Sequence, residues 1–261
     1  MPITADFAIR NAERRFESHN VLARIRGSDA RLQKEYVIYT AHWDAFGRDP
    51  SRIGDQIFNG ALDDAGGTAQ LIEIARSLRS AQIRPRRSIL FIATTAEEKG
   101  LIGFRYYVAH PTFPLRDTVA VINLDAIQVF GSPADMVSVG GQTSLDAELG
   151  RIARSNGRTF AVPDSAFYYN SDQAPFAIAG VPAIFPGSGY LPIEGNKAIR
   201  ERYAKSLRCV HQPCDEVQND WDLTGAAEDA FMWLQLGYTV AQSNAKPEWN
   251  SDSIWRTVRR H

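Results

Sequence analysis

The feature that most constrains the fold is an alternation, along the chain, of apolar strand-like runs with segments of helical periodicity. The apolar runs are rich in Val and Ile without strict alternation of apolar and polar residues, which is the pattern of strands buried on both faces. We therefore predict an α/β fold, a three-layer sandwich in which helices cover both faces of a mostly parallel central sheet. The predicted strands are Asn20–Ile25, Tyr36–Thr40, Ser88–Ala93, Val119–Leu124, Met136–Val139 and Pro182–Phe185, and the predicted helices are Thr68–Ala81, Leu101–Ala109, Leu145–Ser155, Asp172–Ala179 and Ala226–Gln242.

Composition is that of an ordinary globular protein and limits the partners to be expected. Residues 1–261 contain no repeat, low-complexity tract or linker-like change in composition, so we expect one large α/β domain. The net charge of -1 does not favour nucleic acid or an anionic membrane surface, and no apolar run reaches the ~20 residues that span a bilayer. The segment Met1–Phe7 lacks the pattern of a signal peptide. This predicts a cytoplasmic protein, or a secreted or periplasmic one if the sequence is the catalytic part of a longer precursor.

Ionisable residues follow three of the predicted strands. In open α/β sheets ligands bind outside the carboxyl ends of the strands, so these residues are the first candidates for a site. One strand is followed by His42-Trp-Asp44, the next by the pair Glu97-Glu98, and a third by Asp125. Adjacent carboxylates repel each other, and successive side chains on extended backbone point to opposite sides. The pair therefore predicts two different tasks at one edge of the sheet.

Two further segments carry residues of the same kind. A glycine-flanked turn contains Asp63 and Asp64 just before a predicted helix, and a distant segment contains His211 with Asp215 four residues on. Taken singly, most of these residues have ordinary explanations, such as a helix N-cap or a solvated side chain. Asp125 is less easily explained, because a carboxylate is costly to bury unless it is paired or metal-bound. Together, two imidazoles and several carboxylates predict a nitrogen and oxygen site suited to zinc, cobalt or manganese.

Competing chemistries lack their motifs. The sequence has no Gly-x-Ser-x-Gly turn, no Gly-x-x-x-x-Gly-Lys-Ser/Thr loop and no His-Glu-x-x-His helix. The two cysteines, Cys209 and Cys214, flank His211. We expect plain thiols, with a single local disulfide around His211 as the alternative. A cysteine nucleophile is disfavoured, because a histidine two or three residues away in sequence rarely reaches the thiol in a suitable geometry.

The segment Gly187–Arg208 lies between a predicted strand end and His211, and it is polar and basic. We expect a solvated loop. The alternative is a lid over the pocket, whose positive charge would bind a substrate carboxylate as in a carboxypeptidase or dipeptidase. Its basic residues are Lys197, Arg200, Arg202, Lys205 and Arg208.

The ordered set of motifs is specific and covers most of the chain, from about Ser18 to Asp222. It consists of His42-x-Asp44, Gly60-Ala-Leu-Asp63-Asp-Ala-Gly-Gly67, Glu97-Glu98, Asp125 and His211-x-x-x-Asp215. This set resembles that of the co-catalytic zinc aminopeptidase family, which includes bacterial zinc aminopeptidases, plasma glutamate carboxypeptidase, glutamate carboxypeptidase II and the glutaminyl cyclases. The resemblance implies a zinc exopeptidase fold and two Zn²⁺ ions, with Co²⁺ or Mn²⁺ as possible substitutes.

The resemblance also implies a role for each candidate ligand. His42 and Asp125 would hold one zinc ion, and Glu98 and His211 would hold the other. Asp63 would bridge the two ions.

Four further residues receive roles around these ligands by the same resemblance. Asp44 and Asp215 would orient the two histidines, and Glu97 would be the general base that takes a proton from the attacking water. The segment Tyr168-Tyr169-Asn-Ser-Asp resembles the one that supplies a tyrosine to steady the oxyanion, and Tyr168 is the preferred candidate. The alternative for both tyrosines is packing over the pocket wall.

The function implied by the resemblance is that of a zinc-dependent exopeptidase, most directly an aminopeptidase that releases amino-terminal residues from peptide substrates. Within the family, the alternatives are a carboxypeptidase or dipeptidase, and then a glutaminyl cyclase. From another class, the alternative is a non-catalytic binding domain on the same fold. Such relatives lose ligands, whereas all five candidate ligands and the candidate base are present here. One departure is Ser171-Asp172-Gln173, where many relatives have Ser-Asp-His.

Overall fold

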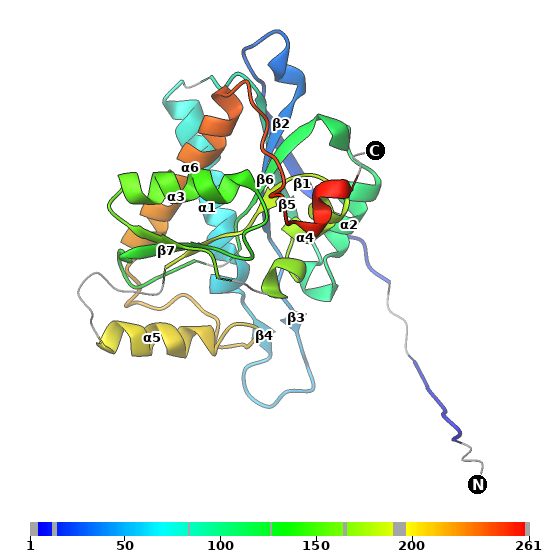
Figure 1. Cartoon of the computed structure of the whole chain (residues 1–261). Coiled ribbons are helices and arrows are strands. Elements are labelled where there is room, and N and C mark those ends of the chain that lie inside the picture. Colours follow the sequence, from blue (N-terminus) through cyan, green and yellow to red (C-terminus); the bar gives the residue numbers. More distant parts are fainter. Residues whose placement is uncertain are drawn as a thin grey trace.

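The computed structural model describes residues 5–11, 15–82, 84–125, 127–163, 166–189 and 197–258. A five-stranded sheet forms the centre of the molecule. Its order is β1 (Val21–Ile25), β5 (Ser88–Thr94), β2 (Tyr36–His42), β6 (Thr118–Asn123) and β9 (Ala183–Ile184). Strands β5, β2, β6 and β9 run parallel, and the edge strand β1 is antiparallel to β5. The predicted mostly parallel sheet is therefore confirmed (Figure 1).

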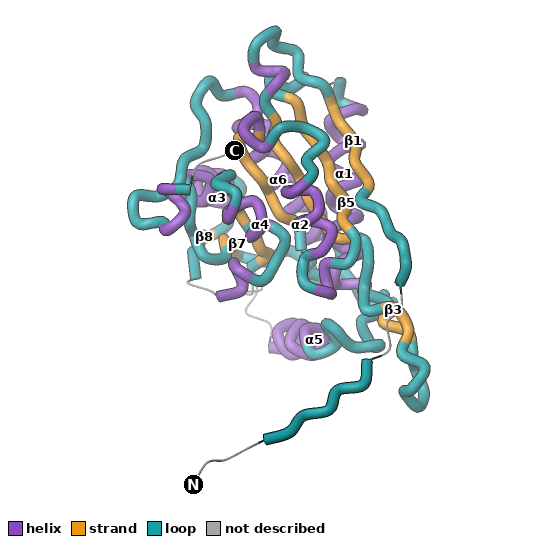
Figure 2. The backbone as a smooth tube through the Cα atoms, turned by 90° about the vertical axis from the view of Figure 1, so that its right-hand side faces the viewer, coloured by secondary structure: helices purple, strands orange, loops and turns teal. Residues whose placement is uncertain are grey.

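Helices cover both faces of this sheet, as the three-layer prediction requires. Figure 1 shows α1 (Gly66–Ser80), α3 (Ser144–Ser155) and α6 (Thr224–Gln242) on one side, and α2 (Ile102–Ala109) and α4 (Gln173–Ile178) on the other. Figure 2 shows the strands side by side, with α2 and α4 in front of them. Tyr39 of β2 packs with Trp233 in the core of the first face, and its neighbour Ile38 packs with Phe104 in the core of the second. The two side chains diverge because successive residues of a strand point to opposite faces.

A second, three-stranded sheet has the order β10 (Pro186–Ser188), β7 (Asp135–Ser138) and β8 (Thr159–Ala161). The predicted strand Met136–Val139 corresponds to β7, but the expectation that it would join the central sheet is wrong. An apolar run indicates a strand without indicating its partner. A short hairpin, β3 (Gly47–Arg48) with β4 (Ile57–Phe58), was not predicted.

Helix α5 (Lys197–Leu207) occupies part of the segment predicted as a solvated loop, so that prediction is wrong for these residues. Lys, Arg, Glu and Ala, which dominate this stretch, all favour helix. Tyr203 also gives the helix an apolar contact, with its ring 6.3 Å from that of Phe130. Residues 190–196 of the predicted loop lie outside the described residues. Figures 1 and 2 show α5 and the β3–β4 hairpin beyond the same end of the central sheet.

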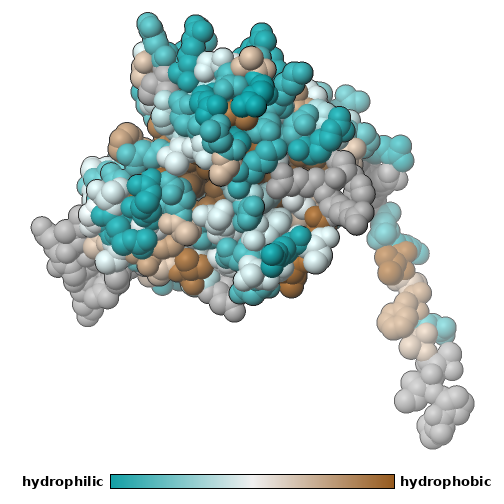
Figure 3. Space-filling view, turned by 45° about the horizontal axis from the view of Figure 1, so that its top comes forward, coloured by the Kyte–Doolittle hydropathy of each residue, from teal (hydrophilic) through white to brown (hydrophobic). Residues whose placement is uncertain are grey.

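Short turns and the amino-terminal segment complete the described part of the chain. The turns are η1 (Leu32–Lys34), η2 (Ala61–Ala65), η3 (Glu97–Lys99), η4 (Leu115–Asp117), η5 (Ala166–Tyr169) and η6 (Ile254–Thr257). Within the described residues, none of the helices combines the length and the apolar character that crossing a membrane requires. Residues 5–11 extend away from the body (Figures 1 and 3). The face seen in Figure 3 is mainly hydrophilic.

Candidate metal centre

The central sheet delivers its ionisable residues to one edge. His42 is the last residue of β2 and lies opposite Thr94, the last residue of β5. Glu97 and Glu98 follow β5 directly, in the turn η3. The end of β6 pairs with β2 near the same edge, which brings Asp125 alongside. The parallel register of three strands is therefore what gathers these side chains.

His42 is buried, with 1% of its side chain exposed. Its Nδ1 lies 3.0 Å from the backbone carbonyl of Asp44, and since a carbonyl only accepts, the proton resides on Nδ1 and Nε2 turns toward the carboxylates. Nε2 lies 2.9 Å from Asp63 Oδ1, 3.8 Å from Asp125 Oδ1 and 4.0 Å from Glu97 Oε2. Burial opposes a charged imidazole, but hydrogen bonds with Asp125 and Asp63 outweigh it and raise the pKa of His42. The surroundings thus favour a positive charge, whether a second ring proton or a metal ion.

The carboxylate of Asp63 lies between the two histidines. Its Oδ1 is 2.9 Å from Nε2 of His42, and its Oδ2 is 2.9 Å from Nε2 of His211. The same nitrogen of His211 lies 3.4 Å from Oε2 of Glu98. One carboxylate that directs an oxygen at each imidazole can bridge a pair of metal ions.

The potential ligand atoms among the described residues form three overlapping groups, within each of which all atoms lie within 4.8 Å of one another. Two of these groups, one that contains Asp125 and one that contains His211, correspond to the two halves of the predicted two-metal set. The structure therefore brings all five predicted ligands, and the predicted base, into one cluster. The donors are imidazole nitrogens and carboxylate oxygens, which fits zinc. The groups are His42, Asp63 and Asp125; Asp63, Glu98 and His211; and His42, Glu97 and Glu98.

The turn that carries Asp63 is held from two sides. Asp215 accepts hydrogen bonds from the backbone amides of Leu62 (2.8 Å) and Asp63 (3.1 Å). Asp64 accepts one from the backbone amide of His42 (3.0 Å), which ties the turn to the end of β2. The sequence predicted that Asp215 would orient the second histidine. Its described hydrogen bonds fix the backbone of the shared carboxylate, and its role toward His211 stays a prediction.

Asp44 contacts both His42 and the predicted base. Its carbonyl is the partner of His42 Nδ1, whereas its carboxylate Oδ1 lies 3.9 Å from that nitrogen. The same Oδ1 accepts a hydrogen bond of 3.4 Å from the backbone amide of Glu97. The predicted contact with His42 is present, and it is made mainly through the backbone.

Glu97 and Glu98 face different partners, as their adjacency in the sequence predicted. Glu97 lies nearer to His42 and Glu98 nearer to His211. Burial raises the pKa of Glu97 to about 7, while the charge of His42 acts in the opposite direction. Burial, with the charges of Asp63 and Glu97, raises the pKa of Glu98 to about 8. A carboxyl group that titrates near neutrality can both take and give a proton.

A polar network lies behind Asp125, and its contacts were not predicted, although Ser171 and Gln173 stood out in the sequence as a departure from the family. Ser171 donates its hydroxyl hydrogen bond to the carboxylate of Asp125. Asn123 donates in turn to Ser171 Oγ (2.8 Å) and to Gln173 Oε1 (2.9 Å). Asp172 is wholly buried beside them, and burial raises its pKa well above the ordinary range. The available signal was Asn123, a polar residue that closes an otherwise apolar strand.

The two tyrosines of η5 have separate surroundings. Tyr168 is buried, and its hydroxyl donates to the backbone carbonyl of Ala183 at 3.0 Å. Tyr169 is half exposed, and its ring lies 6.1 Å from that of Trp255. These contacts agree with packing in the pocket wall. The catalytic role expected for Tyr168 stays a prediction.

Cys209 and Cys214 form a disulfide, with their Cα atoms 5.2 Å apart, so the expectation of two plain thiols is wrong. The loop between them turns back on itself at His211, where φ is +61°. A disulfide needs its Cα atoms within about 7 Å, and spacing along the sequence does not fix that distance. The alternative of a local disulfide around His211 is the one found.

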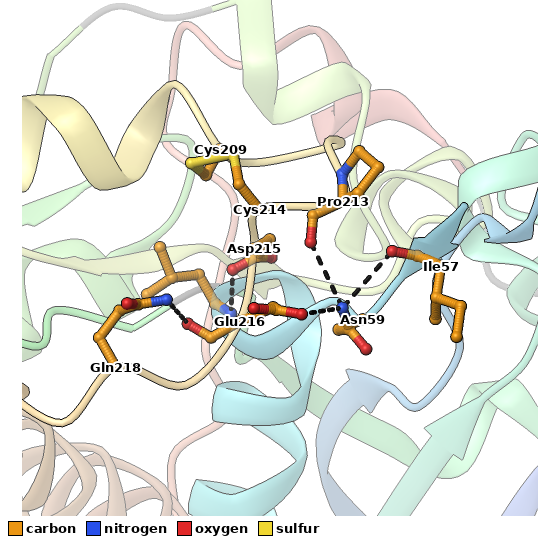
Figure 4. The surroundings of a disulfide bond; sticks show 9 residues. Ile57, Asn59, Cys209, Pro213, Cys214, Asp215, Glu216 and Gln218 are labelled. Atoms are coloured by element: carbon orange, nitrogen blue, oxygen red, sulfur yellow. Dashed lines mark hydrogen bonds between the residues drawn. A yellow bond between two sulfur atoms is a disulfide. The ribbon is translucent and has the colours of Figure 1, made fainter. Parts of the chain in front are cut away.

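His211 is supported less completely than His42. Its side chain is 53% exposed, and the ring of Phe46 packs edge-on against it, with 5.0 Å between ring centroids. Figure 4 shows how the loop is tied to the segment after β4. The side-chain amide of Asn59 donates to the carbonyl of Pro213 (3.3 Å) and to the carboxylate of Glu216 (3.1 Å). A loop, rather than a strand, thus presents this histidine.

The family of the chain follows from comparison with known proteins. Residues 20–235 match the model of peptidase family M28, and the chain therefore belongs to this family. Membership confirms the resemblance predicted from the ordered motifs.

Relatives of this chain include proteins with two kinds of exopeptidase name. The aminopeptidase NAALADL1 of Mus musculus is 40% identical over 120 residues, which are 44% of this chain and 14% of the relative. The glutamate carboxypeptidase 2 homolog of Caenorhabditis briggsae is 34% identical over 260 residues, or 87% of this chain and 31% of the relative. The chain therefore spans only a minor part of the length of these relatives.

A solved structure confirms the fold class. BSAP, a zinc aminopeptidase from Bacillus subtilis, superposes with a TM-score of 0.64 at 23% identity. The superposition covers 87% of this chain and 51% of that one. At this identity the likeness concerns the fold, which is the predicted α/β sandwich.

Proposed function

We propose that this member of peptidase family M28 is a zinc-dependent exopeptidase, and that it acts as an aminopeptidase on peptides with a free amino terminus. The observation that carries the proposal is the shared carboxylate of Asp63, with one oxygen 2.9 Å from each of two histidines. Glu97, Glu98 and further carboxylates crowd the same space. Carboxylates gathered without a cation repel each other, so a purely structural role would not explain the cluster.

The proposal assigns two zinc ions to this cluster, with cobalt or manganese as possible substitutes. His42 and Asp125 would hold one ion, Glu98 and His211 the other, and Asp63 both. Bound there, zinc would polarise the carbonyl of the scissile peptide bond and make a water molecule easier to deprotonate. The nitrogen and oxygen donor set supports this choice of metal.

The proton transfer belongs to Glu97. It takes a proton from the attacking water and delivers it to the leaving amine. The hydrogen bond from the backbone amide of Glu97 to Asp44 holds the base on the His42 side of the cluster. General acid–base catalysis of this kind contributes about 10²–10⁴-fold to the rate.

Other residues position the ligands. Ser171 donates to Asp125 and restrains its carboxylate, and Asp215 holds the turn that carries Asp63. The proposal gives Tyr168 no catalytic role, because its hydroxyl already donates to a backbone carbonyl in the core.

The acidic edge of the cluster supports an aminopeptidase. A free α-amino group is positively charged at neutral pH, and Glu97, Glu98 and Asp125 offer it negative partners. The name of the mouse relative agrees with this reading. The name of the nematode relative favours the alternative, a carboxypeptidase.

The test combines metal analysis with a panel of peptides. Purified protein should contain about two zinc equivalents per chain, lose activity with a chelator and regain it with zinc. Free peptides should be cleaved from the amino terminus, and their N-acetylated forms should resist. If acetylated peptides are cleaved while carboxyl-terminal amides resist, the carboxypeptidase alternative is correct.

Two controls separate the remaining alternatives. Peptides that begin with Gln distinguish a glutaminyl cyclase, which would form a cyclic amino terminus without net hydrolysis. Glu97→Gln should bind zinc without cleaving peptides. A zinc-loaded wild-type protein that cleaves none of the panel would point to a non-catalytic binding domain. Full activity after exhaustive metal removal would overturn the zinc mechanism.

A further inference from the structure

We propose that Lys99 binds a carboxylate on the leaving part of the substrate, and so makes the enzyme prefer peptides in which the residue after the scissile bond is negatively charged. This inference rests on the proposed exopeptidase function. The carboxylate could be an acidic side chain, or the terminal carboxylate of a dipeptide. Both offer the same chemistry to an ammonium group.

The position of Lys99 places its charge beside the His211 half of the cluster. Lys99 ends the turn η3, directly after Glu97 and Glu98, and it is exposed. Its Nζ lies 4.5 Å from the centre of the Phe46 ring. The same ring packs edge-on against His211, with 5.0 Å between centroids. One aromatic ring therefore separates the ammonium from a candidate metal ligand.

The charge of Lys99 is available to a ligand. Among the described residues Lys99 makes no ion pair, whereas Lys246 is paired with Glu35 at 2.7 Å. The two carboxylates next to Lys99 in sequence have other partners, Glu98 with His211 at 3.4 Å and Glu97 with His42 at 4.0 Å. A cation–π contact restrains the position of Lys99 without neutralising it.

The position of Lys99 is restrained by aromatic residues at the base of the β3–β4 hairpin. Phe46 also packs against Phe58 of β4, with 5.7 Å between centroids. The ring under Lys99 is therefore part of an aromatic contact between the two ends of the hairpin. Restraint of the lysine before the substrate arrives reduces the entropy lost on binding.

Charge also fixes which end of the peptide meets Lys99. The α-ammonium of the substrate is repelled by Lys99, so it lies toward the other half of the cluster, around Asp125 and His42. The leaving part of the peptide then extends toward Glu98 and His211, where Lys99 stands. A negative group on that part meets the free ammonium.

The experiment compares substrates that differ only in charge. Leu-Glu-amide and Leu-Gln-amide test the side chain, and Leu-Gly and Leu-Gly-amide test the terminal carboxylate. Wild-type protein should favour the charged member of at least one pair by about 2–5-fold in kcat/KM, the range of an exposed ion pair. The preference should weaken at high salt. The pair that shows the preference identifies the source of the carboxylate.

Variants of Lys99 then test whether this residue is the cause. Lys99→Gln should abolish the preference, and Lys99→Glu should reverse it. Lys34→Gln is the matched control, since Lys34 is also exposed but lies before β2, at the opposite end of the sheet. Calorimetric binding of the same peptides to zinc-loaded Glu97→Gln protein should give the same ratio without turnover.

The outcomes separate this inference from the proposed function. If peptides are cleaved and the ratio is the same in wild type and Lys99→Gln, the inference is wrong and the exopeptidase proposal stands. A preference that Lys34→Gln removes equally would also overturn it, because a general effect of net charge would then be the cause. If no peptide is bound or cleaved, the proposed function fails and the inference fails with it.

Discussion

The two halves of the candidate metal centre use the same kinds of ligand but are supported differently. His42 ends a strand of the core, is 1% exposed, and has Nδ1 fixed by a backbone carbonyl. His211 lies on a loop closed by a disulfide, is 53% exposed, and has a positive φ. Asp63 contacts both. The difference lies in the surroundings of the ligands, not in their chemistry.

This comparison indicates how the centre depends on the fold. The His42 half forms whenever the central sheet forms, because its ligands are continuous with buried strands. The His211 half is added by a loop whose residues are mostly exposed or half-buried, and such segments open more easily than core strands. Loss of the second half should therefore leave the fold intact, whereas loss of the first should not.

The largest expected effect separates Glu97 from Glu98, which belong to different halves although they are adjacent. Glu97→Gln should keep both zinc ions and lower kcat by about 10²–10⁴-fold with KM little changed, because it removes an interaction made only in the transition state. Glu98→Gln should lose one zinc ion, that of the His211 half. Metal analysis and steady-state kinetics on both variants measure this.

The opposite pattern would break the assignment. If Glu97→Gln sheds zinc while Glu98→Gln keeps it, the two roles are reversed. If both variants remain active, neither glutamate is needed for catalysis and the comparison loses its basis.

The second expected effect concerns the two histidines in the zinc-free protein. His42→Ala should lower the free energy of unfolding by about 2–4 kcal/mol, because it leaves a cavity and unpaired buried carboxylates. His211→Ala should change it by less than about 0.5 kcal/mol, as for other exposed residues. Urea unfolding of both variants gives the values. Equal destabilisation by the two substitutions would show that the loop is as integral to the fold as the strand.

The His42 half was the more predictable from sequence, for the same physical reason that makes it the more rigid. Apolar runs rich in Val and Ile predict buried parallel strands, and parallel strands place their carboxyl ends at one edge. His42, Glu97 and Asp125 follow such runs, so the order of residues along the chain was enough to predict that they lie close together. The helical layers followed from periodicity in the same way.

The His211 half depends on contacts that sequence patterns do not encode. The disulfide exists because the loop folds back at His211, and the expectation of plain thiols had no information about that turn. The hydrogen bonds from Asp215 to the backbone of Leu62 and Asp63 were not expected from the sequence. Helix α5 was not predicted because its charged sequence was interpreted as a solvated loop. The strand partners of β7 were not predicted because an apolar run does not indicate which strand it pairs with. The disulfide, the contacts of Asp215 and the pairing of β7 depend on three-dimensional contacts, whereas α5 reflects a local helix preference that the prediction of a loop did not use.

The third expected effect tests the disulfide as the support of the His211 half. The double variant Cys209→Ser and Cys214→Ser should weaken binding of the zinc ion in the His211 half by about tenfold, the lower end of the range for loss of a residue that orients a ligand. The free energy of unfolding should fall by about 2 kcal/mol, the value expected for a loop this short. Competition with a chromophoric chelator resolves the two ions. Equal weakening of both ions, or of neither, would show that the loop holds its shape without the bond.

The smallest expected effect is a pH dependence of the folding stability, which arises from Glu97 and Glu98 in the turn η3. The folded protein raises the pKa of Glu97 to about 7 and that of Glu98 to about 8, both above the unfolded value of 4.5. The folded state therefore binds these protons more tightly, and the zinc-free protein loses stability as the pH rises from about 5 to about 8. The loss should be about 1–2 kcal/mol, less than the shifts alone would give, because water screens partly exposed charges.

Thermal melts of zinc-free and zinc-loaded protein across this pH range measure the effect, and the single variants assign it. Glu98→Gln should remove more of the pH dependence than Glu97→Gln, because the pKa of Glu98 is raised further. Zinc should reverse the slope, since its ligands must lose their protons before they bind it. A zinc-free protein that is more stable at about pH 8 than at about pH 5 would contradict the burial of these carboxylates. If Glu97→Gln instead removes more of the pH dependence, Glu97 is the more strongly buried carboxylate, and it belongs to the His42 half.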